Sequence, residues 1–204
     1  MESTRWNEYK DLLFQATENT DKTIYKYFLD KKQPNNNIKL EPQEVKSPFD
    51  LLQLTDNSKD IIELKVRHKY TYEQFDDISI DTYKIRNMLT YQQELDCTNS
   101  YLVAIYPKSD KIILIDITYI DVEEEDVINR EANHYTITDN PYKKPKQFIA
   151  LNIKNKKDPK LNTKTYQYTF PNLMKTYTDT FKKYCKKYGI PEDIVKRSMK
   201  DLYS

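Results

Sequence analysis

Apolar residues recur at helical spacing in several parts of the chain, and each of these parts is predicted to be a helix. Thr20 or Asp21 can cap a helix that follows the first one, and Ser79 can cap another. Near the end of the chain, Gly189 stops a helix and Pro191 opens the last one. The predicted helices span residues 4–18, 20–32, 79–95, 174–188 and 191 onward.

Short apolar runs bounded by turn residues predict the strands. They span 38–45, 49–54, 60–67, 101–106 and 111–118, with weaker strands at 135–138, 147–153 and 166–170. This order of elements predicts an α+β fold, an α/β sandwich whose central mixed sheet is flanked by helices. We expect one core domain over residues 1–165 and a basic helical segment over 166–204 that packs on it.

Composition excludes several functional classes. The single glycine, Gly189, rules out glycine-rich phosphate loops of the P-loop and Rossmann types. No apolar run approaches the roughly 20 residues of a membrane span, and the first residues lack the apolar stretch of a signal peptide. Cys97 and Cys185 are isolated thiols, which suits a reducing compartment. We therefore predict a cytoplasmic protein without a membrane partner, and origin in a phage or mobile element stays open.

Charge is segregated although the net charge is only +1. Acidic residues dominate 116–131, whereas 141–188 carries thirteen lysines against two acidic residues, Asp158 and Asp179. A basic field of this kind favours a polyanionic partner such as nucleic acid. The alternative is a solvated lysine-rich surface without a specific partner.

One apolar strand carries an acidic residue and a lysine on the same side. Acidic-x-lysine triplets occur five times in the chain, but only Glu63-Leu64-Lys65 lies in a strand-like run. Because strand side chains alternate, Glu63 and Lys65 share one face while their apolar neighbours take the other. An ordinary cross-strand ion-pair ladder on an exposed face is the structural alternative.

A tight turn brings a second carboxylate to the same place. If Asp56 and Asn57 form a two-residue hairpin turn, Asp50 lies directly opposite Glu63. Two carboxylates about 5 Å apart repel, and a shared divalent cation relieves the repulsion. Mg²⁺ suits such oxygen ligands, with the carbonyl of Leu64 as a further ligand, and Lys65 could orient a water for attack on phosphorus.

The series Pro48-Phe49-Asp50 followed by Glu63-Leu64-Lys65 resembles the PD-(D/E)xK signature of the restriction-endonuclease-like nuclease superfamily. One residue separates the proline from the aspartate, which departs from the compact form of the motif. The resemblance covers about residues 1–120 and implies a restriction-endonuclease-like core. It also implies that a basic residue on the next helix supports the site, which points to Lys84. Many members carry a glutamate ligand on the first helix, for which Glu8 and Glu18 are the alternatives.

These features together predict a metal-dependent nuclease, a hydrolase of phosphodiester bonds. Asp50, Glu63, Lys65 and Lys84 are the predicted catalytic residues, with Asp50 and Glu63 binding Mg²⁺, for which Mn²⁺ could substitute. The resemblance favours DNA over RNA as the substrate and endonuclease over exonuclease action. A non-catalytic nucleic-acid-binding or assembly protein is the main alternative, and an interaction protein with an acidic partner is the second.

Further basic and aromatic residues are predicted to bind the nucleic acid. They are Arg67, His68, Lys69, Tyr72, Lys143, Lys144, Lys146, Lys182, Lys183, Lys186 and Lys187. Residues 182–201 have a faint helix-turn-helix pattern, whose alternative is a helical hairpin packed on the core. A homodimer stays open, because an enzyme that cuts both strands together would need two sites.

Overall fold

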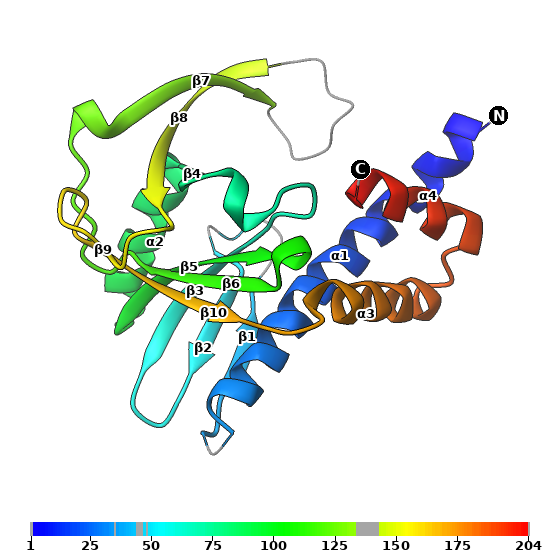
Figure 1. The fold of residues 1–204 in the computed structure, drawn as a ribbon, viewed down its shortest axis with the longest axis horizontal. Coiled ribbons are helices and arrows are strands. Elements are labelled where there is room, and N and C mark those ends of the chain that lie inside the picture. Colours follow the sequence, from blue (N-terminus) through cyan, green and yellow to red (C-terminus); the bar gives the residue numbers. More distant parts are fainter. Residues whose placement is uncertain (1, 35, 44–46, 48, 134–142, 204) are drawn as a thin grey trace.

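A seven-stranded mixed sheet lies between helices on its two faces (Figure 1). The computed structural model describes residues 2–34, 36–43, 47, 49–133 and 143–203. Helices α1 (Glu2–Lys32) and α3 (Leu173–Lys187) cover one face, and α2 (Thr82–Glu94) covers the other. The predicted α+β class, with a mixed sheet flanked by helices, is confirmed.

The sheet has the order β1-β2-β3-β5-β6-β10-β9. Its strands span Lys39–Pro42, Leu51–Leu54, Lys59–Val66, Asn99–Tyr106, Lys111–Asp116, Thr163–Thr169 and Lys157–Asp158 in that order. Strands β3 and β5 are parallel, and α2 lies in the connection between them, as a parallel pair requires. The predicted strands at 49–54, 60–67, 101–106, 111–118 and 166–170 correspond to β2, β3, β5, β6 and β10.

A second, three-stranded antiparallel sheet was not predicted. It consists of β4 (Asp77–Asp81), β8 (Lys143–Asn152) and β7 (Val127–Asn133), in the order β4-β8-β7. The predicted cap at Ser79 is wrong, because Ser79 lies inside β4. Asp81 caps α2 instead, and its carboxylate accepts a hydrogen bond from the amide of Tyr83 at 3.0 Å. The predicted strand at 135–138 lies outside the described residues.

The first 32 residues form one helix where two were predicted. Thr20, which was predicted as a possible cap, instead donates its hydroxyl to the carbonyl of Ala16, four residues earlier, and Thr23 does the same to the carbonyl of Asn19. Such bonds satisfy a polar side chain without ending the helix. Asp21 therefore lies in the middle of a continuous helix, which becomes important for the site.

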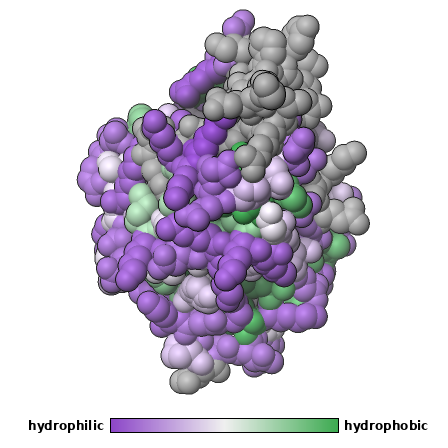
Figure 2. Space-filling view, turned by 90° about the vertical axis from the view of Figure 1, so that its right-hand side faces the viewer, coloured by the Kyte–Doolittle hydropathy of each residue, from purple (hydrophilic) through white to green (hydrophobic). Residues whose placement is uncertain are grey.

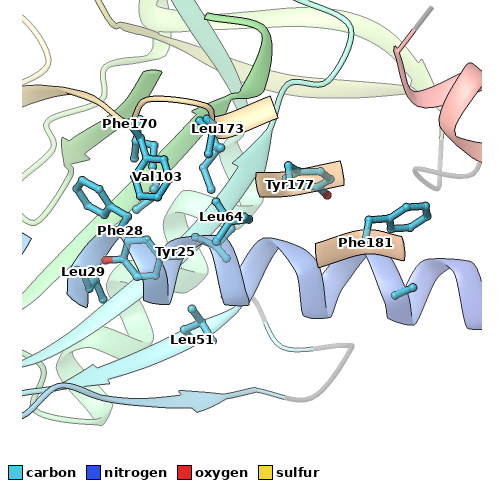
Figure 3. Packing of buried hydrophobic residues seen from close by; sticks show 14 of the residues in the cluster. Tyr25, Phe28, Leu29, Leu51, Leu64, Val103, Phe170, Leu173, Tyr177 and Phe181 are labelled. Atoms are coloured by element: carbon cyan, nitrogen blue, oxygen red, sulfur yellow. The ribbon is translucent and has the colours of Figure 1, made fainter. Parts of the chain in front are cut away.

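Two hydrophobic cores hold the helices against the sheet. In the first, Leu64 of β3 and Val103 of β5 pack against Tyr25 of α1 and Tyr177 of α3 (Figure 3). In the second, α2 packs on the opposite face through Ile85 and Met88. The alternation predicted for β3 is observed, since its even residues face α1 and its odd residues face α2.

The C-terminal helices pack on α1. Helix α3 ends before Gly189, whose φ of 68° favours glycine, and α4 (Glu192–Tyr203) follows. The predicted boundary at 165/166 lies inside β10, and the division into core and C-terminal segment stays a prediction. None of the described helices is both long enough and apolar enough to cross a membrane.

Candidate active site

The hairpin of β2 and β3 has the predicted register. Its turn is closed by the amide of Thr55, which donates to the carbonyl of Ser58 at 2.9 Å. The ladder then runs from the Leu54–Lys59 pair to the Leu51–Ile62 pair. Asp50 follows directly beyond the end of this ladder, at the level of Glu63.

Backbone contacts fix Asp50 at this position. Its carboxylate Oδ2 accepts a hydrogen bond from the amide of Leu64 at 2.7 Å, and its own amide donates to the carbonyl of Ile62 at 3.0 Å. Strand β2 begins at Leu51, so Asp50, one residue earlier, takes the place that a further ladder residue would occupy beside β3. This leaves the second carboxylate oxygen of Asp50 for a ligand.

Glu63 is a buried carboxylate with one oxygen satisfied. Only 1% of the residue is exposed. Oε1 accepts a hydrogen bond from Lys84 Nζ and lies 3.3 Å from Lys65 Nζ. Oε2 is buried and has no hydrogen-bond partner among the described residues. Burial, followed by repulsion from Asp50, raises the pKa of Glu63 to about 7, although both lysines act to lower it.

Helix α1 adds acidic residues on the other side of the site. Burial raises the pKa of Asp21 to about 8, and Asp50 and Glu18 add repulsion, although part of Asp21 remains accessible. The Tyr177 hydroxyl of α3 donates a hydrogen bond to Asp21 and opposes this shift. The sequence pattern predicts Asp21 only as a possible helix cap and gives no sign of a place in the site. Its spacing of three from Glu18 would have placed both on one side of α1 had the helix been predicted as continuous.

These groups line one cleft of about 500 Å³. Glu18 lies in its wall and Glu8 does not, so the structure brings Glu18 to the predicted site. The acidic and basic residues that line the cleft are Glu18, Asp21, Lys22, Asp50, Glu63, Lys65, Arg67 and Lys84. Acidic and basic groups therefore share one opening beside the first residue of β2.

The site fits Mg²⁺ better than a metal that needs an all-protein cage. In the described part of the chain, no three or more His, Cys, Asp or Glu side chains form a ready cluster of metal ligands. Mg²⁺, however, is commonly held by one or two carboxylates and keeps several waters. The unsatisfied Oε2 of Glu63 and the free oxygen of Asp50 match that requirement, and a cation there would relieve the carboxylate repulsion.

Two residues predicted to bind nucleic acid are largely buried. His68 lies in the cleft wall but packs edge-on against Tyr177 at 4.7 Å between ring centres, and burial lowers its pKa to about 4. Its imidazole is therefore neutral at pH 7. Tyr72 is 9% exposed and packs edge-on against Tyr106, with Lys154 over its ring at 3.5 Å. Neither ring presents an open face for stacking with a base.

The remaining predicted nucleic-acid-binding residues lie outside the cleft, except Arg67. Lys69 is exposed just after β3, and Lys146 of β8 lies 3.7 Å from Asp81. Lys143 and Lys144 belong to the same strand. Lys182, Lys183, Lys186 and Lys187 are exposed on α3. Figure 2, which looks at the side of the molecule from which α4 projects, shows a surface dominated by hydrophilic residues.

Comparisons with known proteins leave the function to be argued from the site. No protein-family model and no curated protein sequence matches the chain. One similar solved structure is Hjc, a Holliday junction resolvase from the hyperthermophilic archaeon Archaeoglobus fulgidus. The sequences are 10% identical, the TM-score is 0.38, and the match covers 62% of this chain and 86% of Hjc.

Proposed function

We propose that this protein is a metal-dependent nuclease that hydrolyses phosphodiester bonds in DNA at the cleft between α1, α2 and the end of β2. The observation that carries the proposal is the buried Glu63 carboxylate, with one oxygen held by Lys84 and the other unsatisfied beside Asp50. An exposed ion-pair ladder would place Glu63 in solvent, whereas only 1% of the residue is exposed.

Each charged residue has a distinct role in this proposal. Asp50 and Glu63 supply oxygen ligands. The carbonyl of Leu64 lies on the same side of β3 as its amide, and therefore toward Asp50, because both backbone groups of a strand residue point the same way. Lys65, about one-third exposed, can reach into the cleft to orient an attacking water and to stabilise negative charge that develops on the phosphate. Lys84 holds Glu63 in place.

A bound Mg²⁺ or Mn²⁺ would polarise the phosphate and lower the pKa of the attacking water. The protein contributes the arrangement that receives it. Glu63 pays a desolvation penalty that Lys84 offsets only in part, and the raised pKa of Glu63 records the difference. The raised pKa of Asp21 has the same origin, so α1 supports a site that favours cation binding.

A cleavage assay with matched variants tests the proposal. Supercoiled and linear DNA are incubated with the full chain and Mg²⁺, and Asp50→Asn and Lys65→Met are compared with the wild type. Asn can still accept the Leu64 amide, so the fold is retained while the charge is lost. We expect each variant to lose at least about 100-fold in rate, because each removes a group that acts on the reacting phosphate.

Two control variants make the same chemical changes away from the cleft. They are Asp56→Asn, in the exposed hairpin turn, and Lys164→Met, which replaces an exposed side chain of β10. These controls should cleave like the wild type. If the wild type cleaves no DNA, or if Asp50→Asn and Lys65→Met cleave as fast as their controls, catalysis at this cleft is refuted. DNA binding without cleavage would support the non-catalytic binding protein instead.

A further inference from the structure

The β7–β8 hairpin extends beyond the body of the protein. Strand β4 pairs only with residues 148–152 of β8, whereas β7 pairs with residues 143–149. The part formed by 129–133 and 143–147, here called the ribbon, therefore has two strands and, within the described part of the chain, no third one. Figure 1 shows it reaching past β4 at the top of the molecule. An isolated two-stranded hairpin is only marginally stable in water, so a bound partner would stabilise this outer part of the sheet.

The outer face of the ribbon is basic. Arg130 and Lys146 are direct cross-strand partners, and such partners lie on the same face about 5 Å apart. Two like charges in this position repel each other, and the Asp81 carboxylate, 3.7 Å from Lys146 Nζ, offsets only part of that repulsion. The pair formed by Ile128 and Phe148 continues this face toward the body and is half-buried.

The inner face has a different character. There, Asn129 pairs with Gln147, and both line a hollow of about 350 Å³ that also holds Glu123 and Glu124, two carboxylates against the one guanidinium of Arg86. Carboxylates near this face disfavour a polyanion. The two faces of one ribbon thus differ in charge, which selects the outer face for a nucleic acid.

The outer face is continuous with the candidate active site. Arg130 Nη1 lies 3.4 Å from Ser79 Oγ, and Arg67 Nη2 lies 3.5 Å from the Ser79 carbonyl. Arg67 itself lines the catalytic cleft. Lys146 lies 3.7 Å from Asp81, the residue that caps the helix carrying Lys84. Three cationic side chains, those of Arg67, Arg130 and Lys146, therefore lie along a path from the cleft, over β4, to the ribbon, and Asp81 pairs with the last of them.

We infer that the ribbon binds duplex DNA next to the cleavage site, with Arg130 and Lys146 on backbone phosphates and the two strands in the major groove. This inference rests on the proposed nuclease function for the place of the scissile bond. The major groove of B-form DNA is about 12 Å wide and admits a two-stranded ribbon. A-form duplex RNA has a deep and narrow major groove that excludes one. The ribbon therefore selects DNA over RNA duplexes.

Binding is measured by fluorescence anisotropy with a labelled DNA duplex in EDTA, where cleavage does not enter. The variant Arg130→Ala/Lys146→Ala is compared with Lys157→Ala/Lys164→Ala. The control removes two exposed lysines that are also direct partners, on β9 and β10, so the loss of charge is identical. Asn129→Ala/Gln147→Ala tests the inner face, and circular dichroism confirms that all variants are folded.

We expect the dissociation constant of the Arg130/Lys146 variant to rise at least about tenfold. A plot of the logarithm of the association constant against the logarithm of the salt concentration should have a slope smaller in magnitude by about 2, since each lost phosphate contact contributes about 0.9. The control and inner-face variants should bind like the wild type. The wild type should bind duplex RNA more weakly than duplex DNA, and the Arg130/Lys146 variant should lose this preference.

Equal weakening by the Lys157/Lys164 control, an unchanged salt slope, or equal affinity of the wild type for RNA and DNA duplexes would overturn the inference. These outcomes are separate from failure of the proposed function. If the protein does not cleave DNA, the binding results still decide whether the ribbon holds a duplex. If the ribbon does not bind, cleavage by the wild type still supports the cleft.

Discussion

Replacing Glu63 with glutamine should stabilise the protein at high pH while it abolishes cleavage. The variant keeps the size of the side chain and removes its buried charge. In the folded protein the pKa of Glu63 is about 7, compared with an ordinary value of 4.5. The folded state therefore holds the proton more tightly than the unfolded state does. The contribution of Glu63 to stability is fully present below pH 4.5 and is lost as the pH rises through about 7.

The size of this effect follows from the same two values. A difference of one unit between the folded and unfolded pKa is worth about 1.4 kcal/mol, so the full difference for Glu63 corresponds to about 3 kcal/mol of stability. Urea denaturation followed by circular dichroism, at several pH values from 5 to 8, gives the free energy of unfolding of both proteins. As the pH rises across this range, the free energy of unfolding of Glu63→Gln should increase by about 2 to 3 kcal/mol relative to that of the wild type.

Glu94→Gln, at the exposed end of α2, is the matched control and should follow the wild type at every pH. Parallel curves for wild type and Glu63→Gln would refute the reasoning, because they would show that Glu63 has the same proton affinity in the folded and unfolded chain. A variant that is more stable and yet inactive would identify Glu63 as a charge kept for function at a cost in stability.

Three further outcomes are expected. Mg²⁺ should raise the thermal midpoint of the wild type, by the equivalent of about 2.7 kcal/mol at a hundred times its dissociation constant, and Asp50→Asn should abolish the rise in a thermal-shift assay. Tyr177→Phe removes the hydroxyl that donates to Asp21 and should cost about 1 kcal/mol in urea denaturation at pH 7, whereas no change would contradict this bond. Phe181→Ala creates a cavity between α3 and α1 and should cost about 3 to 5 kcal/mol by the same measurement, while a loss below 1 kcal/mol would contradict the observed packing.

The hairpin that carries the site was predictable because its register depends on local features. A two-residue polar turn fixes which residues pair, and the alternation of β3 fixes which of them face the same side. Neither depends on the rest of the chain. Asp50, Glu63 and Lys65 could therefore be placed together from the sequence, and the structure has this arrangement.

Other features could not be predicted because the local sequence is compatible with two structures. Thr20 can cap a new helix or bond to the preceding turn, and only the packing of α1 on the sheet decides between them. Ser79 could cap a helix, but Ile78 and Ile80 alternate with polar residues as in a strand, and pairing with β8 selects the strand. The burial of Glu63 requires α2 above it, so its raised pKa could not be read from the sequence.

The contact between α3 and the cleft connects the basic C-terminal part of the chain with the candidate active site. Tyr177 lies on α3, donates a hydrogen bond to Asp21 of α1 and packs against His68, two residues after β3. These contacts bury both Asp21 and His68, and burial is the largest cause of each pKa shift. Without α3, both groups would be closer to water and their pKa values closer to the ordinary ones. The electrostatics of the cleft therefore belong to the whole chain, even though its predicted catalytic residues come from a stretch of only 35 positions between Asp50 and Lys84.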